Sequence, residues 1–137
     1  MRIRAPPTGK IDLIPLNSDQ NTLCDYNGID FCYFIIYVKK VDTSKNLFIH
    51  VFQDKQSTFE IYARNLTTAE LNIREKLPNP QNAVFSSMKQ LNTNYLLISL
   101  EKVLLTNLVI AVRSKEKGTI SLLSSLYTYT NKLKEKN

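Results

Sequence analysis

The sequence predicts an all-β fold, and three observations support this prediction. Short runs of apolar, β-branched and aromatic residues recur along the chain, turn-forming residues separate them, and helical periodicity is mostly absent. The chain has 137 residues, of which 43% are hydrophobic and 22% charged, which is typical of a single folded domain. We therefore expect one β-sandwich or barrel.

Seven strong runs and one weaker run are the predicted strands. The strong runs are 11–16, 31–38, 47–53, 59–64, 95–100, 107–114 and 119–127, and the weaker run is 84–88. Pro15 removes a backbone donor from the first run, so this strand is expected at a sheet edge. In the segment 68–77, Thr67 and Glu70 have the spacing of a capping box, which favours a short helix or an irregular crossover.

Alternation within the runs predicts which side chains face the core. Leu108, Ile110 and Val112 are expected on one core face, and the next strand adds Ile120, Leu122 and Leu126. Residues 115–118 are predicted to join these two strands as a hairpin loop. The runs 31–38 and 47–52 are apolar on both faces, so we expect one sheet to be covered on its outer side.

The only stretch long enough to suggest a membrane span is 95–112. Glu101 and Lys102 lie near its middle, where a charge costs about 2.5–3.5 kcal/mol in a bilayer. We interpret it as two strands and a turn, and predict no transmembrane span. Residues 1–10 contain Arg2, Arg4 and two prolines in place of a signal peptide, which indicates an intracellular chain or a mature, trimmed form.

Two cysteines, Cys24 and Cys32, flank a turn-rich loop. A separation of eight residues across such a turn allows a disulfide, which is the favoured interpretation. Two free buried thiols are the alternative, and a metal or redox pair is disfavoured because no further ligands lie nearby. Asp25, Asn27 and Asp30 resemble the start of a calcium loop, but the pattern fails, so Asx turns are expected instead.

Asn65 begins the sole N-x-S/T sequence, just after the predicted strand 59–64. A surface loop and N-glycosylation at Asn65 are therefore expected. Paired cysteines and a glycan would both require an oxidising secretory route.

Few residues could support catalysis. His50, the single histidine, lies on a predicted strand beside Phe48 and Phe52, where a packed or half-exposed side chain is expected. The chain has three glycines, with no phosphate loop and no nucleophile elbow. We predict no enzyme activity, no cofactor and no metal site.

The positive net charge of +6 lies at the two ends of the chain. Residues 1–10 hold three basic residues and no acidic ones, whereas 11–112 hold nine basic and ten acidic residues. We therefore predict an N-terminal arm (1–10), a β-sandwich domain (11–128) and a basic C-terminal tail (129–137). No aromatic residues alternate with the basic ones over a useful length, so no nucleic-acid binding is expected.

The strand pattern also resembles a known family. The matching stretches are IDLIPL at 11–16, DFCYFIIYV at 30–38, NLFIHV at 46–51, STFEIYA at 57–63, NLVIAVRS at 107–114 and GTISL at 118–122. Together they resemble the bacterial pre-peptidase C-terminal domain and its relatives in protist surface proteins. This resemblance implies a single jelly-roll-like antiparallel β-sandwich of about eight strands, secreted and non-catalytic. Thr58 and Glu60 stand where that family often has acidic residues, and only Glu60 is acidic, so no calcium or carbohydrate site is carried over.

These features predict a non-catalytic extracellular or cell-surface β-sandwich that acts through protein contacts, as an assembly subunit or an accessory binding module. The alternative is an intracellular structural subunit of a large protein complex. The expected partners are proteins, including further copies of this chain bound through the N-terminal arm or through edge strands.

Overall fold

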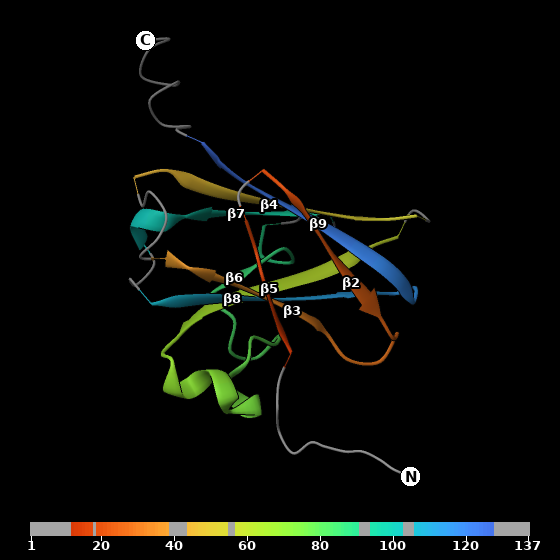
Figure 1. The fold of residues 1–137 in the computed structure, drawn as a ribbon, viewed down its shortest axis with the longest axis horizontal. Helices are drawn as coiled ribbons and strands as arrows, with labels where there is room; N and C mark the ends of the chain where they lie inside the picture. The colour runs from red at the N-terminus through yellow and green to blue at the C-terminus, as the bar shows by residue number, and fades with distance from the viewer. Residues whose placement is uncertain are drawn as a thin grey trace.

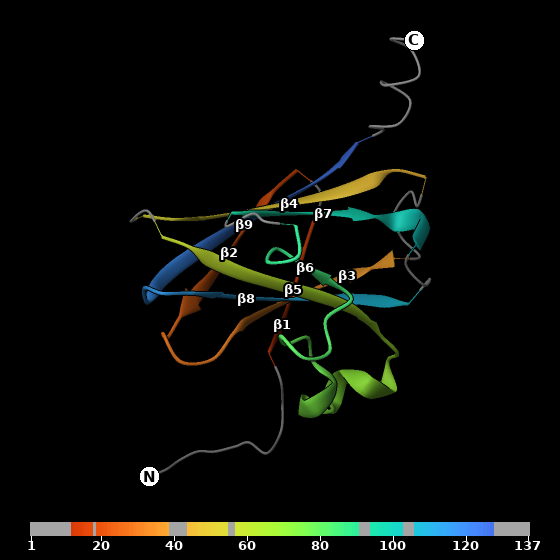
Figure 2. The ribbon, with the colours of Figure 1, turned by 180° about the vertical axis from the view of Figure 1, so that it is seen from behind.

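The protein is a β-sandwich in the computed structural model, which describes residues 12–17, 19–38, 44–54, 57–90, 94–102 and 106–127. Figures 1 and 2 show two layers of strands that face each other. Within the described residues the strands are β1 (Leu13–Pro15), β2 (Asn21–Tyr26), β3 (Cys32–Tyr37), β4 (Asn46–Gln53), β5 (Phe59–Leu66), β6 (Phe85–Ser86), β7 (Tyr95–Ser99), β8 (Asn107–Ser114) and β9 (Gly118–Tyr127). The all-β prediction is confirmed. The predicted arm and tail lie outside the described residues.

The strands form two sheets with nested pairing. Sheet A has the order β1-β3-β8-β5-β6, and sheet B has the order β2-β9-β4-β7. Strand β5 pairs with β6, β4 with β7, β3 with β8 and β2 with β9, all antiparallel. This nesting brings strands that are far apart in the sequence side by side in each sheet.

Three details of the pairing differ from the predictions. Strand β1 lies at an edge, as Pro15 requires, but pairs with β3 in parallel. Strands β8 and β9 do not form the predicted hairpin, because β8 pairs with β3 and β5 whereas β9 pairs with β2 and β4. The connection 115–117 therefore passes between sheets. Strand β2 was not predicted, although Thr22, Cys24 and Tyr26 alternate inward along it.

The main core lies between the two sheets. Leu108, Ile110 and Val112 of β8 face Ile120 and Leu122 of β9, all fully buried. Leu126 packs against the same cluster, so the predicted core face of both strands is confirmed. Because successive side chains of a strand point to opposite sides of the sheet, the residues between these buried ones point to the outer faces of the sandwich.

A second, smaller cluster covers the outer face of sheet A. Leu77 packs there against Ile35, Leu66 and Val109, and Leu71 adds to the cluster. The segment that carries both leucines forms two short 3-10 helices, η2 (Ala69–Asn72) and η3 (Arg74–Lys76), outside the sheet (Figure 1). The expected covering of one sheet is thus found on sheet A.

The predicted capping box fixes the start of this covering segment. The Thr67 amide donates to Glu70 Oε1 at 2.9 Å, and the Glu70 amide donates to Thr67 Oγ1 at 3.3 Å. The Glu70 amide also donates to the Thr67 carbonyl at 3.0 Å, so the reciprocal side-chain bonds add to the backbone bond of the first turn. A short helix or crossover was predicted here, and the structure contains 3-10 turns.

Candidate interaction surface

Strand β4 presents aromatic side chains on the outer face of sheet B. Leu47, Ile49 and Val51 point inward and are at most 2% exposed. The alternate residues Phe48, His50 and Phe52 therefore point outward, where Phe48 and His50 are half-buried and Phe52 is exposed. The run 47–52 is apolar on both faces, but in the described part of the chain nothing covers this outer face as Leu77 covers sheet A.

The neighbouring strands extend this surface. On β7, His50 is opposite Tyr95 and Phe48 is opposite Leu97. On β9, His50 is opposite Leu123, while the small Ser121 and Ser125 lie beside Phe52 and Phe48 and leave their rings accessible. We call this surface the aromatic face. It consists of Phe48, His50, Phe52, Tyr95, Leu97 and Leu123.

The rings of the aromatic face contact one another. His50 lies 4.1 Å from Phe52 and 5.8 Å from Tyr95 between ring centroids, and Phe48 lies 5.1 Å from Tyr95. The ring planes are inclined to each other by 41° to 86° in these pairs. The surface is therefore irregular, with rings at several angles, and does not form a coplanar stacking platform.

The aromatic face is exposed and almost uncharged. Phe52 is 41% exposed, Tyr95 38% and Leu97 37%. From Asn21 to Ser125, the outward positions of β2, β4, β7 and β9 include one carboxylate, Asp25, and no lysine or arginine. Depletion of charge and enrichment of aromatic side chains are typical of the centre of a protein interface.

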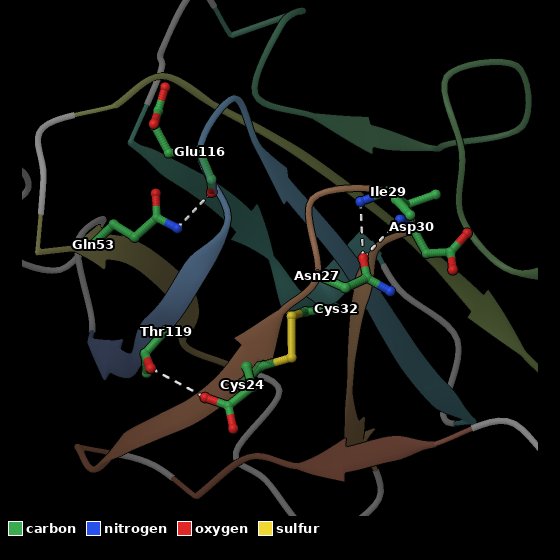
Figure 3. The surroundings of a disulfide bond; sticks show 9 residues. Cys24, Asn27, Ile29, Asp30, Cys32, Gln53, Glu116 and Thr119 are labelled. Carbon is green, nitrogen blue, oxygen red and sulfur yellow. Dashed lines mark hydrogen bonds between the residues drawn. A yellow bond between two sulfur atoms is a disulfide. The ribbon is translucent and has the colours of Figure 1, made fainter.

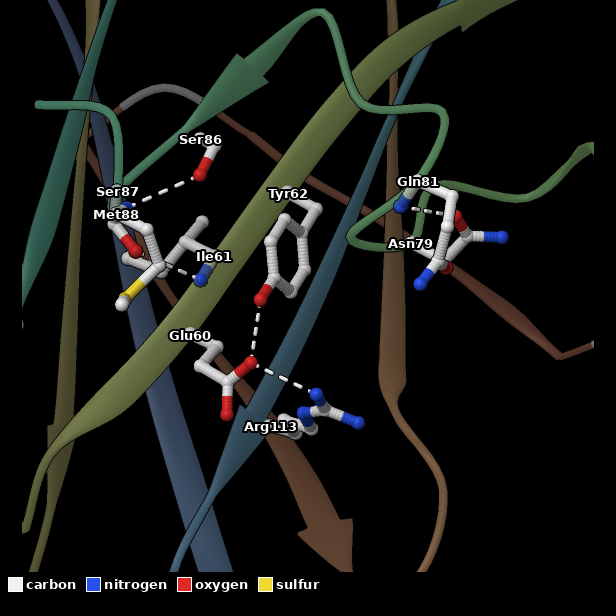
Figure 4. Close-up of polar contacts among 9 residues, drawn as sticks. All are labelled: Glu60, Ile61, Tyr62, Asn79, Gln81, Ser86, Ser87, Met88 and Arg113. Atoms are coloured by element: carbon white, nitrogen blue, oxygen red, sulfur yellow. Dashed lines mark hydrogen bonds and ion pairs between the residues drawn. The ribbon is translucent and has the colours of Figure 1, made fainter.

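The outer face of sheet A is different, because its polar groups bind each other (Figure 4). Arg113 Nη2 donates to Glu60 Oε1 at 2.8 Å, and the Tyr62 hydroxyl donates to the same oxygen. The Arg113 guanidinium also lies 4.7 Å from the centre of the Phe31 ring. Hydrogen bonding from Arg113 lowers the pKa of Glu60, whereas burial and Glu60 raise the pKa of Tyr62 to about 12. This cluster pairs the charges of Glu60 and Arg113 with each other and stabilises the sheet.

The predicted disulfide is confirmed. Cys24 of β2 and Cys32 of β3 are joined, with Cα atoms 6.3 Å apart (Figure 3). The bond links an edge strand of sheet B to sheet A. The loop between the cysteines is an Asx turn, as expected, because Asn27 Oδ1 accepts from the amides of Ile29 at 2.8 Å and Asp30 at 3.1 Å.

Asn65 does not lie in the expected surface loop. It belongs to β5 and is half-buried. Its side-chain nitrogen, Nδ2, donates to Thr106 Oγ1 at 3.2 Å and to the Asn107 carbonyl at 3.4 Å. The strand continues to Leu66 because β8 pairs with it over its full length. The loop prediction was wrong, and glycosylation of Asn65 stays a prediction that requires these hydrogen bonds to be rearranged.

Among the described residues, no three His, Cys, Asp or Glu side chains lie together as metal ligands. A shallow hollow of about 170 Å³ beside the disulfide is lined in part by Ile14, Tyr26 and Phe31. No helix in the described segments is long and apolar enough to cross a membrane.

Known proteins were compared with the chain in three ways. Neither the protein-family models, nor the curated proteins, nor the solved structures include a match.

Proposed function

We propose that this chain is a non-catalytic binding or assembly module that docks a protein partner on the aromatic face of sheet B. The observation that carries the proposal is the exposed, uncharged cluster of Phe52, Tyr95 and Leu97 beside His50. The ring neighbours of His50 are themselves aromatic and carry no carboxylate or thiol that could assist catalysis. A contact role therefore suits this surface better than a reaction.

The chemistry of the aromatic face favours a protein over a carbohydrate. Sugar rings stack on aromatic side chains that lie flat, whereas the rings of Phe48, His50 and Tyr95 are tilted against each other. Leu97 and Leu123 add aliphatic surface between and beside the rings. The matching partner presents apolar side chains of irregular shape and no charge at the centre of the contact.

The size of the face indicates a modest interface. The aromatic face covers positions 48–52 of β4, which span roughly 17 Å, and three strands, which are roughly 14 Å wide, giving an area of about 240 Å². A standard stable complex buries about 800 Å² on each partner. We therefore expect a reversible contact, or one part of a larger interface.

The proposal places the protein outside the cell or on its surface. The Cys24–Cys32 disulfide supports this location, because cytosolic proteins keep their thiols reduced. The same bond disfavours the alternative role as an intracellular subunit. The resemblance to the pre-peptidase C-terminal domain family stays a prediction.

Site-specific photocrosslinking in the native host tests the docking face. A photoreactive benzoylphenylalanine is placed at position 52 and, as a matched control, at position 73, because Phe52 and Ile73 are both 41% exposed. Ile73 lies between η2 and η3, away from sheet B. A discrete heterologous protein should be crosslinked from position 52 only, and Leu97→Lys should abolish the crosslink. No crosslink from position 52, or the same product from position 73, would refute the proposal.

A further inference from the structure

The edges of the two sheets differ in how they are protected. In sheet A, edge strand β1 has three residues and includes Pro15, and edge strand β6 has two residues. Both are too short to bind another strand well. In sheet B, edge strand β7 is capped by Gln90, whose side-chain nitrogen donates to the Leu97 carbonyl at 2.8 Å and whose oxygen accepts from the Leu97 amide at 3.0 Å. Gln90 thus occupies the amide and carbonyl of Leu97, in the middle of this edge, where an added strand would bind.

The remaining edge strand, β2, has six residues and pairs with β9 on one side. Within the described segments no side chain caps its backbone as Gln90 caps β7. The disulfide at Cys24 ties β2 to β3 and holds this edge in an extended form. A rigid, uncapped edge is a template for another extended strand.

We propose that β2 pairs antiparallel with β2 of a second copy of this chain, with the two-fold axis at Leu23. The residues of β2 that point outward are Asn21, Leu23 and Asp25, and Leu23 is 61% exposed. This register places Leu23 opposite its own copy and joins the two copies of sheet B into one continuous sheet. A closed two-fold contact of this kind uses the same strand on both copies.

Charge favours this register over one centred on Asp25. With Leu23 on the axis, Asn21 is opposite Asp25 of the partner subunit, so an amide faces a carboxylate twice across the pair. Asn21 Oδ1 accepts from Ser121 Oγ at 3.2 Å, so the side-chain oxygen of Asn21 is turned toward β9 and away from the carboxylate of the partner subunit. Moving the two-fold axis by two residues, from Leu23 to Asp25, would set Asp25 opposite its own copy, and like charges directly opposite destabilise a strand pair.

This pairing uses the edge of sheet B and not its face, so it can fail while docking on the aromatic face holds. Leu23→Lys and Leu97→Lys are matched tests of the two surfaces. Both replace an exposed leucine that points outward from an edge strand of sheet B, and only position 23 lies at the proposed axis.

Sedimentation velocity of the full-length chain over a range of concentrations tests the pairing. We expect a concentration-dependent dimer that Leu23→Lys weakens by at least roughly tenfold, because two ammonium groups would meet at the axis. Leu97→Lys should leave the dimer unchanged. Asn21→Lys should tighten it by roughly two- to thirty-fold, because each lysine would face Asp25 of the partner subunit.

Three outcomes would overturn the inference. They are a monomer at every concentration, a dimer that Leu97→Lys disrupts and Leu23→Lys does not, and a dimer that Asn21→Lys weakens. Far-UV circular dichroism of each variant confirms that the fold is kept, which the exposure of both leucines favours. Crosslinking from position 52 to a heterologous protein is read separately and reports only on the aromatic face.

Discussion

Removal of the Cys24–Cys32 disulfide should destabilise the protein by a predictable amount. The bond closes a loop with a sequence separation of eight residues. The chain-entropy model assigns about 2.5 kcal/mol at 25 °C to a loop of this length, through restriction of the unfolded chain. The double variant Cys24→Ala and Cys32→Ala should lose this amount, and alanine introduces no new polar group at Cys32, which is 3% exposed.

Urea denaturation followed by far-UV circular dichroism measures the loss, since the chain has no tryptophan. The free energy of unfolding should fall by about 2.5 kcal/mol, and the dependence on urea should become steeper because the unfolded chain is less compact. Wild-type protein in reductant should behave like the double variant, and reductant should not affect the double variant further.

A loss below about 0.5 kcal/mol would refute this reasoning, since it would mean that the link between β2 and β3 does not restrict the unfolded chain as the loop-closure model requires. An unchanged wild-type protein under conditions shown to reduce the bond would refute it independently. A loss that comes with a shallower urea dependence would point to a change in the native state instead.

The remaining predictions concern sheet A. Leu77→Ala should lower the free energy of unfolding, measured by urea denaturation, by about 2–5 kcal/mol, because Leu77 is buried in the cluster on the outer face of sheet A. A loss below about 1 kcal/mol would show that the 3-10 segment does not stabilise that face. Stability should fall as the pH rises from 10 towards 12, because the Tyr62 hydroxyl loses its proton at a lower pH in the unfolded chain than in the folded protein. Tyr62→Phe should reduce this fall, and an identical alkaline stability profile for the variant and the wild type would contradict the prediction. Stability should also fall as the pH drops below 4.5 through the lowered pKa of Glu60, because protonation removes the charge that Arg113 binds. Glu60→Gln should diminish this acid-dependent loss of stability, and an unchanged loss would argue against the Arg113 contact.

Local features of this fold could be predicted from the residues alone. Alternation predicted the core faces of β8 and β9, because a strand has a period of two. The capping box at Thr67 and the Asx turn at Asn27 also depend on residues close in sequence. The pairing of Cys24 with Cys32 belongs to the same class, since eight residues separate them.

Weak or misleading local signals account for two errors. Strand β2 was missed because Asn21 and Asp25 are polar and its inward positions include a threonine and a cysteine in place of large aliphatic residues. The loop expected at Asn65 was wrong because the strand, predicted to end at Arg64, continues through Asn65 to Leu66, where it pairs with β8.

The sequence by itself determined the all-β class, the edge position of Pro15 and the core faces of β8 and β9, and it favoured the disulfide. Only the tertiary structure decided that β8 and β9 lie in different sheets, that sheet A is covered by Leu77, and that the aromatic face of sheet B is open. The physical reason is the distance over which the deciding contacts act. A period of two separates the faces of a strand, but which face is covered depends on partners such as β2 and β9, which pair across about 100 residues of chain.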